Sequence, residues 1–522
     1  MRRGWSVASA AKPNVGSESV ATDAVAGSPR GPVGTTAEVL RAAAAAHPRR
    51  EAYVHGEWRV TYGWVDRAAD GFAATVAGLG AGPGSTVCLL LRSSTELAAC
   101  YLGALRAGAI TSAINLRLGP LEQASILERT EPVVTVTGDG IEPPSGVSPG
   151  TVLRLHDLDA AFSTAPTAAL PEMALSDPAC VVWTSGTTGV PKGAVFDHAA
   201  MAAISRSIGS LTQPGDRRLL MLPFPHVGFM TRIWDELANG TTTVIVGEPW
   251  SAAESARLLV EEQITIATGV PTQWSLLLDQ LDDRAVTLPA LRVITIGGGA
   301  IAPELVRRMR ATLGCPVVSR YTCTEAGVAT STALDDPSDV AERSAGRPAP
   351  EVELRIAADD TGIGEVWCRS PAMMRGYWRD PEHTAEVIDA AGWLHTGDLG
   401  RRDDAGNLHI VGRTKELYIR GGYNVYPAEV EHVLAEHPAV ARVAVVGTPD
   451  PVLGEIGVAY VVAAPGPGTP DLATLRAWCR DRIADYKSPD RIELVDTLPV
   501  TSMLKVDKRS LAHHAGKGAE PR

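Results

Sequence analysis

The chain has 522 residues, several times the length of a typical domain, so a single hydrophobic core is excluded. Hydrophobic residues make up 45% and charged residues 21% of the sequence, which excludes a disordered, collagen-like or coiled-coil chain. The net charge of −12 disfavours a nucleic acid or an anionic membrane as partner, so an anionic ligand needs a local binding site.

The N-terminal segment 1–30 contains Ser, Ala, Gly and Pro but no apolar core, so we expect a disordered extension instead of a secretory signal. Apolar runs in the sequence all stay shorter than the ~18 residues of a membrane helix. The seven cysteines are scattered without a CxxC pair, which gives no support for a disulfide framework or a structural zinc site. These features predict a soluble, cytoplasmic protein without a membrane span.

Short apolar segments alternate with helical patterns over most of the chain, which is typical of an α/β fold. Strands are predicted at 87–91 and 133–136, with a helix over 95–106. After the loop at 184–193 the alternation continues with predicted strands at 219–222, 243–246, 265–267 and 292–296. Continuously apolar strands usually lie in sheets covered by helices on both faces. We therefore expect two doubly wound αβ subdomains.

The sequence changes character after residue 346. Short β-like pieces separated by Gly and Asp turns predict a small β subdomain over 346–412. The last hundred residues form an α+β pattern of their own, and we expect fraying after Leu511. We place the boundary at Gly412 to Lys415, which gives a large N-terminal domain over 31–412 and a C-terminal domain over 413–522.

The strongest local signal is the loop that follows the apolar strand at 179–183. It reads Thr184-Ser185-Gly186-Thr187-Thr188-Gly189-Val190-Pro191-Lys192-Gly193. Glycines allow close backbone approach to an oxyanion, while hydroxyls, N–H groups and a lysine can contact phosphate oxygens. The glycine spacing differs from that of a Walker A loop, so P-loop kinase chemistry is disfavoured. On this string alone, a flexible surface turn remains an alternative.

Four further strings follow in a fixed order. They are Arg320-Tyr321-Thr322-Cys323-Thr324-Glu325, His395-Thr396-Gly397-Asp398, Gly412-Arg413-Thr414-Lys415-Glu416 and Leu498-Pro499-Val500-Thr501-Ser502-Met503-Leu504-Lys505. Together they offer an aromatic face for a base, carboxylates for Mg²⁺ or ribose, and cations for phosphate. Taken singly, each has an ordinary explanation as turn chemistry or as a solvated charge.

The five strings in this order resemble the adenylate-forming superfamily of acyl-CoA synthetases, adenylation domains and beetle luciferases, over about residues 37–511. This resemblance implies that ATP and a carboxylic acid give an acyl-adenylate and pyrophosphate, and that the thiol of coenzyme A then displaces AMP. The implied enzyme is an ATP-dependent carboxylate–CoA ligase that uses Mg²⁺. A mobile C-terminal domain with a hinge near Lys415 is also implied, and a homodimer remains open.

The resemblance assigns roles to individual residues. Thr324 would contact the α phosphate, Glu325 and Thr184 would hold Mg²⁺, and Lys505 would bridge the acid and the α phosphate. His226 matches an aromatic gate between the ATP and acyl sites, with packing under a Pro-rich turn as the alternative. Further nucleotide and coenzyme A contacts are implied for Thr184, Ser185, Gly186, Thr187, Thr188, Gly189, Lys192, Gly298, Gly299, Arg320, Tyr321, Thr322, Asp398, Arg413, Gly421 and Gly422.

The acyl pocket of such enzymes is lined by segments that correspond here to Phe229, Met230, Trp234, Gly269, Val270, Pro271 and Ala300. These residues are mostly apolar with no obvious cation, so the interpretation favours a hydrophobic acid over a dicarboxylate or an amino acid.

One departure from the family pattern concerns the lysine loop. Relatives usually have glycine before the lysine, whereas this chain has Met503-Leu504, and a bulky residue restricts the backbone there. This departure keeps three alternatives open beside the ligase. They are an enzyme that only converts a preformed acyl-adenylate to its thioester, acyl transfer to a carrier protein, and a non-catalytic nucleotide sensor.

Overall fold

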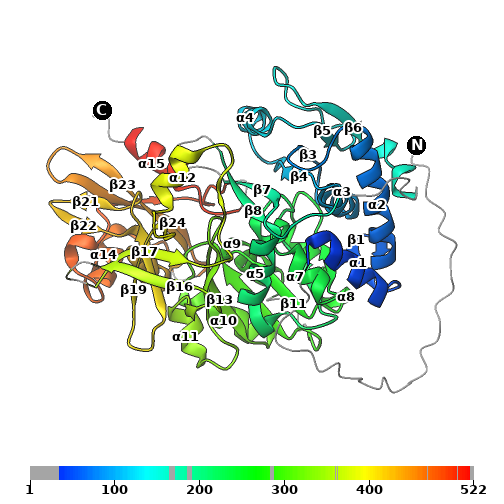
Figure 1. Cartoon of the computed structure of the whole chain (residues 1–522). Helices are drawn as coiled ribbons and strands as arrows, with labels where there is room; N and C mark the ends of the chain where they lie inside the picture. The colour runs from blue at the N-terminus through cyan, green and yellow to red at the C-terminus, as the bar shows by residue number, and fades with distance from the viewer. Residues whose placement is uncertain are drawn as a thin grey trace.

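The structure is a computed structural model that describes residues 34–163, 171–184, 191–281, 287–358, 360, 362–466, 468–501 and 504–517. The predicted N-terminal extension and residues 185–190 of the phosphate loop lie outside the described residues. The described chain forms four β-sheets with helices around them. Two large sheets and their helices make up the N-terminal part, and the C-terminal sheet lies at one end beside a small sheet (Figure 1).

The first large sheet has seven strands and is mainly parallel. Its order is β18 (Gly376–Tyr377), β8 (Lys192–Asp197), β7 (Pro178–Thr184), β4 (Ile110–Ala113), β3 (Thr86–Leu90), β5 (Val134–Thr137) and β6 (Thr151–Arg154). The predicted strands at 87–91 and 133–136 are confirmed within one residue. The phosphate loop connects the antiparallel neighbours β7 and β8, so its two ends are held side by side.

The second large sheet has nine strands. Its order is β15 (Arg347–Pro348), β14 (Gly327–Ser331), β13 (Val317–Cys323), β12 (Val293–Gly297), β11 (Ile266–Gly269), β9 (Arg217–Leu220), β10 (Thr242–Ile245), β1 (Glu51–His55) and β2 (Trp58–Thr61). The neighbours from β13 to β1 pair in parallel. The carboxyl ends of these strands therefore share one edge, which is where ligands bind in open α/β sheets.

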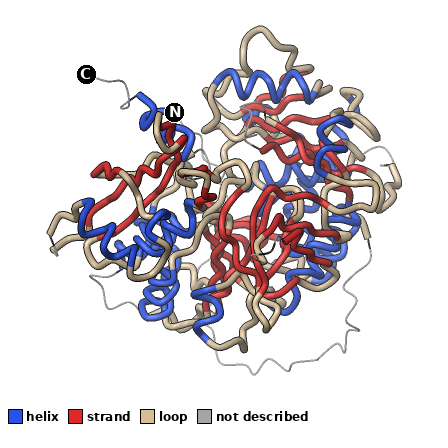
Figure 2. Tube along the Cα trace, turned by 90° about the vertical axis from the view of Figure 1, so that its left-hand side faces the viewer, coloured by secondary structure: helices blue, strands red, loops and turns tan. Residues whose placement is uncertain are grey.

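Helices cover both faces of the two large sheets. The layer that shares a core with both sheets contains α1 (Thr36–Ala46), α2 (Tyr62–Gly78), α3 (Thr95–Arg106), α5 (His198–Ile208), α6 (Val227–Met230) and α7 (Ile233–Ala238). The other face of the nine-stranded sheet packs on α8 (Ala252–Glu261), α9 (Pro271–Leu281), α10 (Pro303–Leu313) and α11 (Ser338–Arg343). The seven-stranded sheet packs on α4 (Pro120–Thr130). Figure 2 shows this alternation of strands and helices.

The helix over 95–106 has the predicted bounds, and its start has a local cause. The side chain of Ser94 accepts a hydrogen bond from the backbone N–H of Leu97, which satisfies one of the free donors of the first turn. Every residue of this helix except Glu96 is buried, because the helix lies between the two sheets and packs against α2. The α/β fold class expected from the sequence is thus confirmed, with helices on both faces of each sheet.

The small β subdomain is a four-stranded antiparallel sheet. Its order is β16 (Glu353–Ala358), β17 (Gly364–Arg369), β19 (Leu394–Arg402) and β20 (Leu408–Arg413), and α12 (Pro381–Val387) lies between β18 and β19 along the chain. The strands that carry Asp398 and Arg413 are neighbours in this sheet, and these two residues face each other across the ladder. The change of sequence character after residue 346 therefore marks this sheet.

The C-terminal part is a five-stranded sheet with three helices. It contains β21 (Tyr418–Arg420), β22 (Tyr423–Val425), β23 (Val440–Asp450), β24 (Gly454–Ala463), β25 (Arg491–Leu494), α13 (Pro427–Ala435), α14 (Leu472–Arg480) and α15 (Lys508–Lys517). The expected fraying after Leu511 is wrong as far as residue 517. Leu511 and Ala515 are buried against β23 and β24, so the helix has an apolar anchor.

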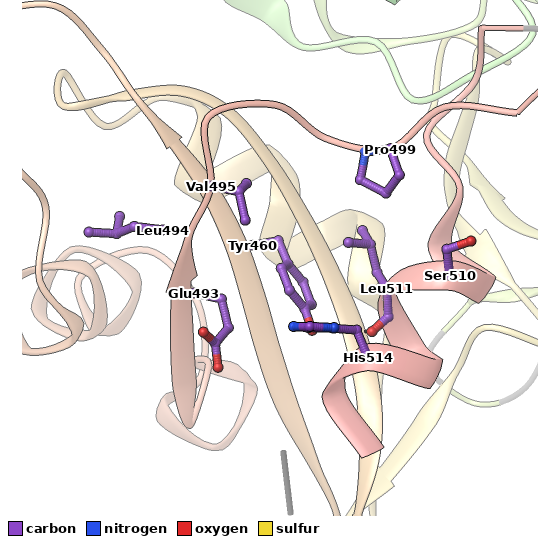
Figure 3. A pocket seen from close by; sticks show the side chains of 8 residues that line it. All are labelled: Tyr460, Glu493, Leu494, Val495, Pro499, Ser510, Leu511 and His514. Atoms are coloured by element: carbon purple, nitrogen blue, oxygen red, sulfur yellow. Dashed lines mark hydrogen bonds between the residues drawn. The ribbon is translucent and has the colours of Figure 1, made fainter. Parts of the chain in front are cut away.

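A cavity of about 390 Å³ lies between β25 and α15 (Figure 3). Tyr460 closes one side of it: its hydroxyl donates to the carbonyl of Leu511 at 3.2 Å, and its ring meets the edge of His514. The residues Pro499 and Ser510 of the cavity flank the segment that carries Lys505. These contacts fix α15 to the sheet and so hold both ends of that segment. None of the helices described is long and apolar enough to cross a membrane.

Candidate active site

Lys505 lies at the carboxyl edge of the nine-stranded sheet, next to the predicted glycine-rich segment that follows β12. Gly298 has φ +76°, and a Cβ placed on it would lie 3.6 Å from Cε and 3.8 Å from Nζ of Lys505. The same Cβ would lie 3.5 Å from the side chain of Val270, which follows β11. A side chain at position 298 would therefore occupy the space between the lysine and the predicted acyl pocket.

Lys505 sits in a tight turn between Pro499 and Asp507. Thr501 donates its N–H to the Lys505 carbonyl at 2.7 Å, and Leu504 donates its N–H to the Thr501 carbonyl at 3.0 Å. Leu504 has φ +58°, the left-handed conformation in which glycine is preferred, and its side chain packs against the core of the N-terminal part. The turn thus demands a glycine-like backbone, and leucine adopts it without withdrawing Lys505 from Gly298.

The charge of Lys505 depends on its surroundings in the cleft. Its side chain keeps contact with solvent, yet protein atoms enclose it and lower its pKa, and the cation of Arg413 acts in the same direction. Asp398 and Glu325 oppose this shift. Binding of an anion next to Lys505 is therefore favourable, because an added negative charge would offset the desolvation of the ammonium group.

Asp398 links two other predicted nucleotide residues, Tyr321 and Arg413. Its side chain is only 4% exposed, and it accepts hydrogen bonds from the Tyr321 hydroxyl at 2.6 Å and from Arg413 Nε at 2.7 Å. The Asp398 carboxylate raises the pKa of Arg413, so this guanidinium stays charged. β13, β19 and β20 each contribute one member of the triad. The predicted association of these strings, which lie far apart in sequence, is therefore seen in the structure.

Glu325 lies at the end of the turn after β13, where the sequence predicts a metal ligand. One carboxylate oxygen accepts a hydrogen bond from the Tyr377 hydroxyl at 2.9 Å. Lys192 Nζ lies 5.3 Å from the centre of the Tyr377 ring, so the lysine at the end of the phosphate loop approaches Glu325 through this tyrosine. Thr184 donates its hydroxyl to the Lys192 carbonyl at 3.3 Å, across the base of the loop.

Tyr377 was not singled out from the sequence. It lies on the two-residue strand β18, which pairs with β8 and thereby lies beside the phosphate loop. A tyrosine after a glycine carries no signal of its own, and only the pairing of β18 with β8 brings it to Glu325.

His226 caps the short helix α6, as its position after a Pro-rich turn permits. Its Nδ1 accepts the N–H of Gly228 at 3.1 Å, so the remaining proton of the neutral ring is on Nε2. Burial lowers the pKa of His226 to about 3, and the positive charge of Lys505 contributes to the shift. The imidazole is therefore close enough to Lys505 to sense it and is neutral at physiological pH. The predicted packing role and the predicted gate position are compatible here.

The pKa of His226 predicts how stability depends on pH. Because the folded-state value of about 3 lies below the ordinary value of 6.5, protonation favours the unfolded state, and the contribution to stability is lost as the pH falls from 6.5 towards 3. Asparagine can also cap a helix. Urea titrations measure the free energy of unfolding at pH 7 and at pH 5. We expect the decrease between these two pH values to be about 1 kcal/mol smaller in His226→Asn than in the parent protein. Equal losses in both proteins would contradict the neutral assignment.

The predicted acyl-pocket residues fall into two groups. Val270 and Pro271 lie against the glycine segment, where a Cβ on Gly299 would be 3.5 Å from the Pro271 ring. Trp234 instead donates its indole N–H to the Gly34 carbonyl at 3.1 Å, and it is nearly fully buried beside α1. Phe229 stacks on Phe224 with ring centres 3.7 Å apart and is completely buried.

The remaining residues predicted for the acyl pocket are Met230, Gly269 and Ala300. Met230 is buried, and its carbonyl accepts the Tyr101 hydroxyl at 2.6 Å. Gly269 lies where a Cβ would be 2.5 Å from the Met221 side chain, so any larger residue would collide there. Ala300 is exposed at the end of the glycine segment. The buried Gln273 was missed from the sequence; it accepts the N–H of Val270 and donates to the Met221 carbonyl, which fixes this edge.

The two glycines predicted for coenzyme A form a turn. Gly421 and Gly422, both with positive φ, connect β21 to β22 and are exposed. A Cβ on Gly422 would meet no atom within 4 Å. In the pose described, Lys505 lies at the predicted nucleotide residues, while the turn of Gly421 and Gly422 is open to solvent. Lys415 lies between β20 and β21, where the chain passes from the small sheet to the C-terminal sheet.

A lysine on a C-terminal unit that meets a nucleotide-type cluster on a large α/β unit defines the class of adenylate-forming enzymes. Comparison with known proteins gives the family. Residues 40–378 match the AMP-binding enzyme family and residues 429–505 match the AMP-binding enzyme C-terminal domain. The chain belongs to the AMP-binding enzyme family.

Relatives and solved structures agree with this assignment. The chain is 35% identical to 3-[(3aS,4S,7aS)-7a-methyl-1,5-dioxo-octahydro-1H-inden-4-yl]propanoyl:CoA ligase of Rhodococcus jostii, over 91% of this chain and 98% of the relative. A Mycobacterium tuberculosis fatty acyl CoA synthetase superimposes with a TM-score of 0.72 at 30% identity, covering 93% of this chain and 99% of the other. The o-succinylbenzoate CoA synthetase of Bacillus subtilis, with its acyl-adenylate, gives a TM-score of 0.79 at 26% identity, covering 93% and 98%.

The enzyme class expected from the sequence is therefore confirmed. The protein is an ATP-dependent carboxylate–CoA ligase that forms an acyl-adenylate and then an acyl-CoA, with ATP and coenzyme A as substrates. A large N-terminal domain and a small C-terminal domain are also confirmed. An enzyme limited to thioester formation is not favoured, in keeping with the position of Lys505 beside Gly298.

Proposed function

We propose that this protein activates a hydrophobic carboxylic acid, with Lys505 promoting the first half-reaction. The observation that carries the proposal is the position of Lys505, which lies against Gly298 and within electrostatic reach of Asp398 and Glu325. In this step a carboxylate oxygen attacks the α phosphorus of ATP, the bond between that phosphorus and the α,β-bridging oxygen breaks, and pyrophosphate leaves. Negative charge builds up on the α-phosphoryl oxygens, where an ammonium group stabilises it.

The nucleotide itself would lie across the Tyr321–Asp398–Arg413 triad. Tyr321 offers a ring for adenine next to Gly298 and Gly299, and Asp398 offers carboxylate oxygens for the ribose hydroxyls. Thr322 and Thr324, in the turn after this tyrosine, would approach the α phosphate. The loop from Thr184 to Lys192 would hold the β and γ phosphates.

Mg²⁺ fits the residues present. Glu325 is partly exposed, and Tyr377 occupies only one of its carboxylate oxygens among the described residues, which leaves the other for a hard cation. The Thr184 hydroxyl, close to the base of the phosphate loop, would be the second protein ligand. Bound there, the ion would neutralise charge on the phosphate oxygens.

For the second half-reaction we propose that the C-terminal domain, residues 413–522, rotates about Lys415 relative to residues 31–412. The rotation would remove Lys505 and bring the exposed Gly421–Gly422 turn to the acyl site, where its lack of side chains leaves room for the pantetheine arm of coenzyme A. The thiol sulfur then attacks the acyl carbon, and AMP leaves. A cytoplasmic location and a homodimer remain part of the proposal from sequence.

The hydrophobic acid class rests on the buried and apolar character of the residues around Val270 and on the names of the relatives. Those names describe a ring-containing propanoyl ligase, a long-chain fatty acid ligase and a feruloyl-CoA synthase, all of which act on acids with a large apolar part.

The proposal predicts that a panel of fatty, aromatic and polycyclic acids, incubated with ATP, Mg²⁺ and coenzyme A, yields at least one acyl-CoA with one pyrophosphate per product. Mass spectrometry and a coupled pyrophosphate assay measure both. Failure of every acid to release pyrophosphate would contradict adenylation, and acyl-CoA formation from synthetic adenylates alone would favour the thioester-only alternative.

A further inference from the structure

Five charged side chains are buried together between the nine-stranded sheet and α7. Arg218 and Arg320 come from β9 and β13, Arg232 precedes α7, and Asp235 and Glu236 lie within α7. Their exposed fractions are 2% for Arg218, 6% for Arg320, 7% for Arg232, 2% for Asp235 and 1% for Glu236. Three guanidinium groups therefore face two carboxyl groups with little access to bulk water.

The two acids are already engaged. Arg218 lies 3.3 Å from Glu236 and 3.7 Å from Asp235, and Arg232 reaches Asp235 only at 3.5 Å. Asp235 also accepts hydrogen bonds from Ser205, Thr212 and Asn239, and Glu236 accepts one from Thr243. Burial raises the pKa of Glu236, which weakens its ability to neutralise a neighbouring cation. The two carboxylates of the cluster therefore pair with Arg218 and, in part, with Arg232.

The side chain of Arg320 has neither a hydrogen bond nor an ion pair to any residue in the described part of the chain, and its Nε is fully buried without a partner. The Nε of Arg232 is in the same state. Burial and the neighbouring guanidinium groups lower the pKa of Arg320 to about 9 and that of Arg232 to about 10, so both are cations at neutral pH. A buried cation without an anion is costly, and this cost points to a missing partner.

The position of Arg320 indicates where that partner comes from. Arg320 pairs with Gly297, the residue before the glycine that contacts Lys505, and a Cβ on Gly297 would lie 3.5 Å from the Arg320 Cβ. Ser319, the residue before Arg320, donates its hydroxyl to the Ala341 carbonyl in α11, on the other face of the sheet, so Arg320 takes the face opposite to α11. Arg320 therefore leaves the strand on the side of α6 and α7, next to the predicted acyl site.

The nucleotide is a less suitable partner. Tyr321, the next residue, directs its hydroxyl to Asp398, and successive side chains of a strand point to opposite faces. The role of Arg320 as a nucleotide contact, predicted from the resemblance, would need its side chain on the Asp398 side, whereas its charged neighbours are Arg232, Arg218 and Asp235.

We propose that Arg320, with Arg232 beside it, forms the far end of the acyl site and binds a second carboxylate of the substrate. The inference rests on the proposed function and assigns it a hydrophobic acid with a second carboxylate remote from the reacting one. It departs from the expectation drawn from the sequence, which disfavoured a dicarboxylate because the predicted pocket residues include no cation. Lys505 would meet the carboxylate that is activated, and Arg320 the carboxylate that is kept. A guanidinium suits this role because its N–H groups match a carboxylate in a bidentate geometry.

The test compares α,ω-dicarboxylic acids of 6 to 16 carbons with their monomethyl esters, which keep the length and lose the second charge. The readout is kcat/KM for pyrophosphate release with ATP and coenzyme A. At the best chain length we expect the diacid to exceed its monoester by at least ~10-fold, because a buried polar site rejects an analogue that leaves it unpaired. Arg320→Met should lower the value for the diacid by ~100-fold and lower the value for the monoester far less, so that the preference for the diacid is lost.

Arg320→Lys is the charge-retaining variant and should preserve part of the preference. Arg292→Met is the matched control. This arginine lies immediately before β12, at the opposite end of the strand from Gly297, where it pairs with Asp216 and donates to the Leu211 carbonyl. It should change stability without changing the ratio of diacid to monoester. Thermal unfolding of every variant shows which of them fold.

Three outcomes would overturn the inference. They are a preference for the monoester at every length, an equal loss of both substrates in Arg320→Met, or turnover of plain apolar acids with no turnover of any diacid; the last would leave the proposed function standing. If no acid of any kind releases pyrophosphate, the proposed function fails, and calorimetry with AMP and each diacid decides the inference. Binding that Arg320→Met weakens at least ~10-fold supports it, and unchanged or absent binding overturns it.

Discussion

Lys505→Ala should slow pyrophosphate release from ATP and acid by at least 100-fold, while conversion of a synthetic acyl-adenylate to acyl-CoA stays within about threefold of the parent rate. The lysine lies at Gly298 in the described pose, where a charge would stabilise the α-phosphoryl transition state. Removal of one such group typically costs about 3–4 kcal/mol of barrier. In the proposed second half-reaction the C-terminal domain takes another pose, so this step should not need the Lys505 side chain.

Lys487→Ala is the matched control for that variant. Lys487 is on the same C-terminal unit and is bound to Glu429, so it shares the chemistry of Lys505 without its position. Both half-reactions should proceed at the parent rate. An equal loss of both half-reactions in Lys505→Ala would indicate damage to the domain as a whole and would contradict a role confined to adenylation.

Asp398→Ala should raise the KM for ATP by about 100-fold with a smaller change in kcat. Asp398 is the common acceptor for Tyr321 and Arg413, and its buried carboxylate would also bind the ribose. The variant loses hydrogen bonds to a charged group, each worth about 1.5–3 kcal/mol, and leaves the Tyr321 hydroxyl without its acceptor. Initial rates over a range of ATP concentrations measure the effect.

Tyr321→Phe is the graded comparison for Asp398→Ala. It removes one hydrogen bond of 2.6 Å but keeps the aromatic ring and the Asp398–Arg413 pair, so we expect only about a tenfold rise in the KM for ATP. A parent-like KM in Asp398→Ala, with loss only of kcat, would contradict the placement of ribose on this carboxylate.

Much of the fold was predictable because the strands of the two large sheets are short, apolar and regularly separated. The helix over 95–106 has the predicted bounds, and the strands predicted at 87–91 and 133–136 lie within one residue of β3 and β5. The last helix was not predicted, since its residues 508–517 are mostly polar and only Leu511 and Ala515 provide an anchor. Burial of these two residues depends on β23 and β24, which the local pattern cannot reveal.

Site residues could be predicted where they belong to one of the sequence motifs. Contacts between strands that are distant in sequence, such as that of Tyr377 with Glu325, could not be predicted. The Tyr321–Asp398–Arg413 triad could be anticipated from the order of the strings, and the structure brings its members together. Leu504 was correctly identified as a residue at a glycine-like position, but its effect was misjudged. The left-handed backbone has a cost, and the packing of the leucine side chain against the core offsets it.

The buried arginines illustrate what sequence patterns do not contain. Arg218 and Arg232 stand in apolar surroundings without any motif, and a single arginine is most often a solvated surface residue. Arg320 was assigned to the nucleotide because it precedes Tyr321. The packing of α7 on the sheet shows which face of β13 Arg320 occupies. It also shows that only two carboxyl groups lie near the three guanidinium groups.

In the proposed adenylation pose, Lys505 on the C-terminal domain meets the nucleotide and the acid at Gly298. A crystal structure with a non-hydrolysable acyl-adenylate analogue would test this placement. We predict the adenine against Tyr321, the ribose hydroxyls on Asp398, and Lys505 Nζ within hydrogen-bond distance of the linkage between acyl group and nucleoside. An analogue bound away from Asp398, or bound there with Lys505 pointing into solvent in every domain pose, would contradict this placement.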